Sequence, residues 1–148
     1  MNIIIPIKDF NLNNVYYSEK IKNTVMPDSY FIRIIYSNSD VTLNGIYLKC
    51  FFSVLNISNH YNKYICNLNI NENTELVSYL RNLEMSILQK FNIKEKSPVY
   101  NLQDSLSQNI IKIFSDLPIL DTSYFILKIS GIWESNREYG LTFKFIEH

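Results

Sequence analysis

The sequence predicts a mainly β protein with one principal α-helix, in the order three strands, one helix and three strands. Runs rich in aromatic and β-branched residues alternate with short polar turns over most of the chain, which is typical of antiparallel sheets. One segment, residues 75–91, changes to the spacing of three and four that indicates an amphipathic helix. No repeat and no Pro/Gly/Ser-rich linker divides the 148 residues, so we expect a single domain over residues 1–148.

Three strands are expected before the helix. They are YFIRIIYS at residues 30–37, VTLNGIYLKCFFSVLNIS at residues 41–58 and KYICNLNI at residues 63–70. Polar turns separate these runs, and Asn44-Gly45 marks a bend in the second, so we expect an antiparallel meander. Residues 1–26 mix apolar and polar types without a lasting period, which leaves open whether they form a leading strand or an N-terminal arm.

The helix is the most regular element of the sequence, and Asn73 or Thr74 suits its N-cap. Its apolar stripe consists of Leu76, Val77, Leu80, Leu83, Ile87, Leu88 and Phe91. After the helix, we expect a loop with at most one helical turn at residues 94–108 and a short strand at residues 109–114. Residues 124–148 are expected to form a closing β-hairpin.

This order of elements matches the oligonucleotide/oligosaccharide-binding (OB) barrel, in which a helix lies between the third and fourth strands of a small closed sheet. The sequence therefore favours an antiparallel OB-like barrel or a strongly curved sheet. Ferredoxin-like and other α+β sandwiches also combine strands with helices, but they usually need a second long helix, and no second long helical period is present.

Composition restricts the partners and the compartment. Fourteen basic residues balance 14 acidic ones, so a nucleic-acid site has to be a local patch and not a global positive field. No run approaches the roughly 20 apolar residues of a membrane span, and MNIIIPIKDF is too soon interrupted for a signal peptide. We therefore expect an intracellular, soluble protein that does not bind membranes. Cys50 and Cys66 lie in strand-like runs and are expected to be buried thiols.

The motifs of common enzyme classes are absent from the sequence. It has no GxxxxGK[ST] phosphate loop, no GxGxxG and no GxSxG. Two histidines and two cysteines without CxxC or HxxxH spacing predict no metal site. Glu134 and Glu138 flank a hairpin turn, where carboxylates are usually only solvated. We therefore expect a non-enzymatic protein with no metal and no small-molecule cofactor.

Side-chain alternation divides each predicted strand into a core row and a second row. In the closing hairpin we expect the core row to contain Phe125, Leu127, Ile129, Trp133, Leu141, Phe143 and Phe145. The second rows of four strands each place a cation among apolar or aromatic side chains. The candidate nucleic-acid-binding residues of these rows are Phe31, Arg33, Tyr47, Lys49, Phe51, Lys128 and Lys144, and Arg137 is added from the hairpin turn.

Two interpretations of these rows stay open. Aromatic rings that stack on bases, beside Lys or Arg that neutralise phosphates, are what a site for single-stranded nucleic acid requires. The same residue types are also typical of the solvent face of a half-buried sheet, where long cationic side chains cover aromatic neighbours.

Three sequence blocks carry a resemblance to a known class of proteins. They are NVYYSEKIKNTVMPDSYFIRIIYS, TLNGIYLKCFF and FILKISGIWESNREYGLTFKF, about half of the chain. Together they resemble small proteins of nucleo-cytoplasmic large DNA viruses, some of which look like phage-type single-stranded-DNA-binding proteins with an OB fold. The resemblance implies a protein that coats single-stranded DNA without sequence preference in viral DNA replication, recombination or repair. Phage-type binders recruit partners through an acidic tail with a terminal aromatic residue, whereas this chain ends in KFIEH.

A second function class fits the same residues. The exposed Tyr and Phe side chains would also serve as anchors of a protein interface. The alternative is therefore a non-enzymatic viral protein-interaction module, such as a virion component, an assembly factor or an inhibitor of a host protein. Pairing of subunits through sheet edges or through the N-terminal arm is compatible with both functions.

Overall fold

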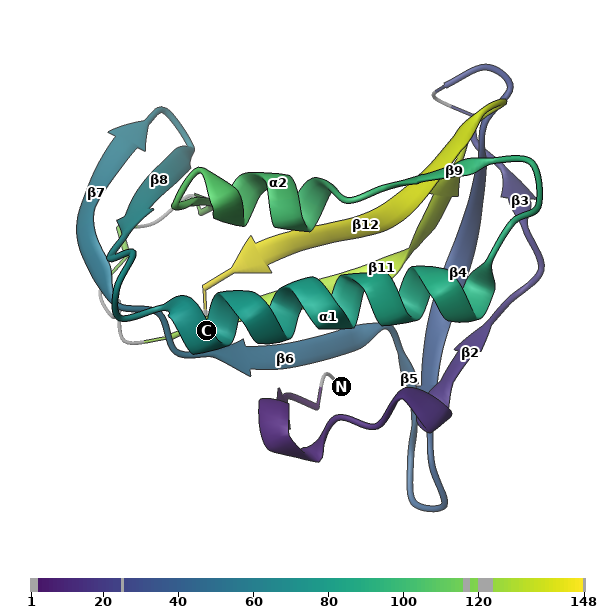
Figure 1. Ribbon diagram of the computed structural model, residues 1–148, viewed down its shortest axis with the longest axis horizontal. Helices are drawn as coiled ribbons and strands as arrows, with labels where there is room; N and C mark the ends of the chain where they lie inside the picture. The colour runs from purple at the N-terminus through teal and green to yellow at the C-terminus, as the bar shows by residue number, and fades with distance from the viewer. Residues whose placement is uncertain (1–2, 25, 116–117, 120–123, 148) are drawn as a thin grey trace.

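The computed structural model describes residues 3–24, 26–115, 118–119 and 124–147. In this part of the chain twelve strands form one mixed sheet. Figure 1 shows the two helices, α1 (Thr74–Phe91) and α2 (Asn101–Ser107), in front of β11 and β12. The prediction of a mainly β protein with one principal helix is confirmed. Neither described helix is long and apolar enough to cross a membrane.

The strand order shows how segments far apart in the sequence come together. Along the sheet the order is β1 (Ile5–Pro6), β6 (Ile46–Cys50), β11 (Phe125–Glu134), β12 (Glu138–Ile146), β10 (Ile110–Phe114), β8 (Lys63–Leu68) and β7 (Val54–His60). β4 (Tyr30–Ser37) pairs with β11, β2 (Val15–Tyr17), β3 (Ile21–Lys22) and β5 (Thr42–Asn44), while β9 (Ser97–Val99) pairs with β12. Most ladders are antiparallel, but β1/β6, β10/β12 and β9/β12 are parallel.

The sheet is not closed into a barrel, because β1 and β7 end the strand order without pairing with each other. The two-residue β1 offers little backbone for such a closure. The expected three-stranded meander is also wrong. The run at residues 41–58 breaks into β5, β6 and β7, of which β5 pairs with β4, β6 pairs with β1 and β11, and β7 pairs with β8.

β11 is the central strand of the sheet. One of its edges pairs with β12, and the other pairs with β6 over Phe125–Ile129 and then with β4 from Gly131. The chain therefore has to turn sharply where β5 ends and β6 begins. Gly45 occupies this position with φ of 97°, a conformation that glycine adopts without steric cost, and the bend expected at Asn44-Gly45 is confirmed.

The principal helix lies where the apolar spacing predicts it. It begins at Thr74 and packs Leu80, Leu83, Ile87 and Leu88 into the core. Asn73 occupies the N-cap position without capping the helix. Its buried amide instead accepts a hydrogen bond from Ser53 N (2.8 Å) and donates one to Ser53 O (2.8 Å), which ties the helix start to the segment between β6 and β7.

The second helix falls in the segment expected to be a loop. Glu84 of α1 is fully buried, and its carboxylate accepts hydrogen bonds from Leu102 N (3.0 Å) and Gln103 N (2.9 Å) at the start of α2. These two backbone N–H groups would otherwise lack partners at a helix N-terminus. A side chain from a distant helix thus caps α2, which local sequence does not reveal.

A β-bulge changes which side of the sheet the end of β11 presents. Ile129 pairs with Phe143 and Gly131 with Thr142, so Ser130 is an extra residue in β11. Beyond it, Ile132 faces the core and Trp133 faces the other side. The expectation that Trp133 continues the core row of Phe125, Leu127 and Ile129 is therefore wrong, because simple alternation does not count the inserted residue.

Candidate nucleic-acid interface

The sheet face opposite α1 and α2, which we call the open face, carries the side chains that alternate with the buried rows. In β6, Ile46, Leu48 and Cys50 are fully buried toward the helices, so Tyr47 and Lys49 lie on the open face. The same alternation places Arg33, Lys128 and Lys144 there. Cross-strand pairing sets Lys128 beside Tyr47 and Lys144, Ile126 beside Lys49, and Gly131 beside Arg33.

One end of the open face holds an aromatic pair with a cation. The rings of Phe51 and Tyr124 are 5.6 Å apart between centroids. Lys49 Nζ lies 4.2 Å from the Tyr124 ring centroid and 5.2 Å from that of Phe51. Phe51 is 62% exposed, which is unusual for a phenylalanine that follows a buried strand. A flat apolar surface with an adjacent ammonium group is therefore accessible at this end.

The centre of the open face is hollowed. A cavity of about 300 Å³ is lined by Phe31, Arg33, Asn44, Tyr47, Lys128 and Ser130. We call it the hollow. Tyr47 is only 7% exposed and forms its floor, with Lys128 Nζ 5.6 Å from the ring centroid. Its volume lies at the lower end of the roughly 300–1,000 Å³ range of small-ligand sites, and two of its lining side chains are cationic.

Two glycines allow aromatic rings to approach the backbone closely at the far end of the open face. A Cβ on Gly131 would lie 2.6 Å from the Phe31 ring, and one on Gly140 would lie 2.9 Å from the Trp133 indole. Trp133 also pairs directly with Phe31 across β11 and β4. Each ring therefore lies where a side chain on the glycine would collide with it, and each keeps part of its surface exposed.

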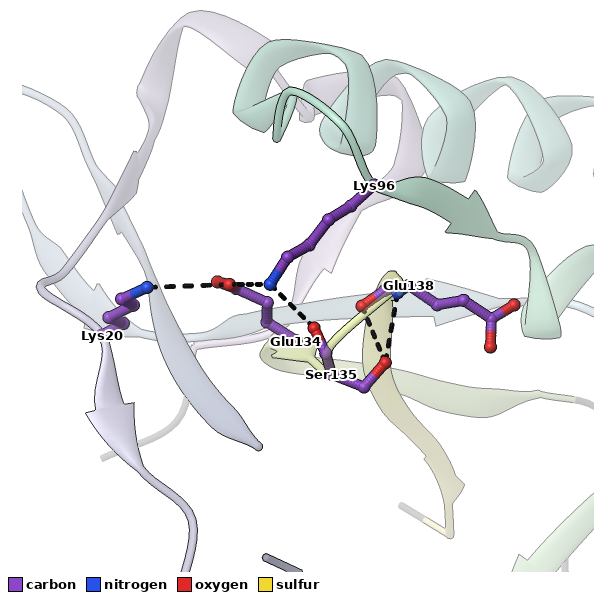
Figure 2. A network of polar contacts seen from close by, with 5 residues as sticks. All are labelled: Lys20, Lys96, Glu134, Ser135 and Glu138. Atoms are coloured by element: carbon purple, nitrogen blue, oxygen red, sulfur yellow. Dashed lines mark hydrogen bonds and ion pairs between the residues drawn. The ribbon is translucent and has the colours of Figure 1, made fainter. Parts of the chain in front are cut away.

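The cations of this face form no ion pair with an acidic group of the described residues. The ion pairs found among the described residues both involve Glu134, which is buried on the helix side. Figure 2 shows Glu134 between Lys20 and Lys96, at 3.6 Å and 2.5 Å from their Nζ atoms. In the described part of the chain Arg33, Lys49, Lys128 and Lys144 form no ion pair, although the protein as a whole has no net charge.

Most of the residues predicted from the sequence lie on the open face. Phe31, Arg33, Tyr47 and Lys128 share the hollow. Lys144 pairs with Lys128, Lys49 lies further along β6, and Phe51 follows directly after the end of that strand. Arg137 does not join them: it is exposed in the β11–β12 turn, where its carbonyl accepts a hydrogen bond from Ser97 N (2.9 Å). Tyr47 is too deeply buried to stack freely, which alternation alone does not show.

Several residues of this face were missed. Lys112 in β10 follows the same alternation between the fully buried Ile111 and Ile113, and that signal is readable in NIIKIF. Trp133 was missed because the bulge is not visible in sequence. Asn44 reaches the hollow from β5 only because β5 and β6 meet at Gly45.

A metal-ligating cluster or a reactive thiol would be another kind of chemical centre among the described residues. They contain no group of three His, Cys, Asp or Glu side chains placed to hold a metal ion. Cys50 and Cys66 are free and buried, and burial raises the pKa of these thiols to about 12 and about 11. Both therefore stay protonated near neutral pH, where a thiol is a poor nucleophile.

Comparison with known proteins identifies no relative. No protein-family model matches the chain, and neither the curated proteins nor the solved structures include a significant match.

Proposed function

We propose that this protein binds single-stranded nucleic acid on the open face of its sheet, without sequence preference. The observation that carries the proposal is the run of cations beside aromatic rings along β11, from Lys49 with Phe51 to Arg33 with Phe31, none of them paired with a described acid. Aromatic rings stack on any base, and ammonium or guanidinium groups displace counterions from phosphates.

The arrangement favours single strands over duplex. Bases are available for stacking only when they are unpaired, and the exposed Phe51 and the partly exposed Trp133 are side chains that stack on bases and do not read base edges. The resemblance to viral proteins supports a role in coating strands exposed during DNA replication, recombination or repair.

Fluorescence anisotropy with labelled poly-dT of about ten to thirty bases tests the proposal directly. We expect binding at low salt, weaker binding to duplex of equal length, and a slope of log affinity against log salt near −3, about −0.7 for each of four phosphate contacts. Lys144→Gln should weaken binding and Lys94→Gln, an exposed lysine in the loop after α1, should not.

Two results would reject this function. One is the absence of binding at low salt, and the other is equal affinity for duplex. Either result would favour the protein-interaction module, in which Phe51 and Trp133 act as anchors for a protein partner.

A further inference from the structure

Three lysines from three neighbouring strands line up across the open face. Lys128 of β11 pairs directly with Lys144 of β12. Ile113 of β10 pairs with Phe145 of β12 in parallel, so Lys112 and Lys144, each one residue earlier, also lie side by side. Ile111, Ile113 and Phe145 are buried toward the helices, which places both lysines on the open face. We call Lys112, Lys144 and Lys128 the lysine row.

The lysine row is electrostatically unfavourable in the free protein. Neighbouring strands are about 4.8 Å apart, and like charges directly opposite each other destabilise a sheet. No ion pair to these lysines is found among the described residues. Glu138 is the acidic residue on the same face of β12 as Lys144, and it lies at the opposite end of that strand. A bound anion with regularly spaced charges would relieve this repulsion.

The two ends of the lysine row lie next to different features of the open face. One of its ends is Lys112, two residues from Phe114, which is 56% exposed. The other end is Lys128, which lines the hollow together with Arg33 and the Tyr47 floor. An exposed aromatic ring therefore lies at the start of the row and a cavity of about 300 Å³ at its end.

We propose that the lysine row is a phosphate track: the sugar–phosphate backbone of a bound single strand crosses β10, β12 and β11 in succession and delivers one nucleotide to the hollow. The inference rests on the proposed function and extends its site to Lys112. The bound nucleic-acid strand then crosses the three β-strands along the lysine row. Phe114 contacts a base at one end of this crossing, and the hollow contacts a base at the other end.

The test compares Lys112→Gln, Lys144→Gln and the control Lys94→Gln in the full chain, with labelled dT oligonucleotides of about 20 bases as probe. Lys112→Gln should lower affinity roughly fivefold at about 50 mM salt and reduce the magnitude of the salt slope by about 0.7, as Lys144→Gln does. Lys94→Gln should match the parent protein in both measurements.

A second measurement needs no nucleic acid. Because each substitution removes repulsion within the row, Lys112→Gln and Lys144→Gln should raise the midpoint of urea unfolding at low salt, and the gain should disappear at high salt. The control should show no such gain. This measurement also confirms that the variants fold.

The outcomes separate the two proposals. If the parent protein binds no oligonucleotide, the proposed function and the track both fail. If the parent binds and Lys144→Gln weakens binding while Lys112→Gln does not, the function stands and the track is wrong. Equal losses in Lys112→Gln and Lys94→Gln indicate a general charge effect and also overturn the track. Stronger binding to anionic phospholipid vesicles than to the oligonucleotide would assign the lysine row to a membrane surface instead.

Discussion

Trp133 shows how one inserted residue changes the role of a side chain. Its indole covers Gly140 on the open face and is partly exposed. We expect Trp133→Ala to reduce the free energy of unfolding by about 1–2 kcal/mol, less than a fully buried aromatic would. It should also weaken single-strand binding by about 1–3 kcal/mol through the loss of stacking. Urea unfolding and anisotropy measure the two effects separately.

Phe125→Ala provides the contrast, because Phe125 is fully buried on the helix side of the same strand. This variant should lose about 3–5 kcal/mol of stability. If Trp133→Ala costs as much as Phe125→Ala and leaves binding unchanged, Trp133 is a core residue and the assignment to the open face is incorrect.

Glu84 makes stability depend on pH. Burial raises the pKa of its carboxyl above the usual 4.5, the hydrogen bonds from Gln103 and Leu102 partly offset this, and Asp104 adds to the rise. The folded state therefore holds the proton to higher pH than the unfolded state does. The contribution of Glu84 to stability should fall as pH rises from about 4.5 toward the raised pKa.

Urea unfolding of the parent protein and Glu84→Gln between about pH 4 and pH 7 measures this contribution. Because glutamine does not titrate, the free energy of unfolding of the parent protein should fall relative to that of Glu84→Gln as pH rises. A difference that moves in the opposite direction would mean that the hydrogen bonds to the ionised carboxylate outweigh its burial.

At the scale of single elements, α1 holds the core together through its apolar stripe. Leu80 is fully buried at the centre of that stripe, and Ser78, two residues earlier, is exposed. Leu80→Ala should lower the free energy of unfolding by about 2–5 kcal/mol because it leaves a cavity. Ser78→Ala should change it little, and chemical denaturation measures both. A negligible cost for Leu80→Ala would indicate that the stripe is a surface for a partner.

The bulge in β11 leaves no room for a side chain at Gly131. A Cβ there would lie 2.2 Å from the backbone oxygen of Ile32 and 2.6 Å from the Phe31 ring. Gly131→Ala should therefore force β4 away from β11 and cost about 1–3 kcal/mol. Ser130→Ala adds no atom and should be nearly neutral in thermal unfolding. Similar melting temperatures for the two variants would contradict the close contact between these strands.

Across the whole molecule, cations gather on the open face although the total charges cancel. The sheet brings Arg33, Lys49, Lys128 and Lys144 together from four strands, while Glu84 and Glu134 are buried on the helix side. The composition correctly requires any nucleic-acid site to be a local patch. It does not show which of these cations lie next to each other, because that depends on which strands become neighbours.

Local pattern was sufficient for most individual elements. Alternation, helical spacing and turn residues each act over a few positions of the chain. They were enough to predict the eight residues of β4, the bend at Gly45, the start and end of α1, and both strands of the closing hairpin. Because alternation also sorts side chains between the two faces, the placement of Arg33, Lys49, Lys128 and Lys144 on one side could be predicted without knowing how the strands pair.

Pairing between distant segments was not accessible in this way. Contacts between residues far apart in the chain determine which two strands pair with one edge of β11 and leave the sheet unclosed. Such contacts also form the hollow and the cap that Glu84 supplies to α2. The bulge at Ser130 is equally non-local, since it exists only relative to the register of β12. Short-range preferences determine whether a segment forms a strand or a helix and which face each side chain occupies. Long-range packing determines which elements lie next to each other, and the candidate site forms between these neighbouring elements.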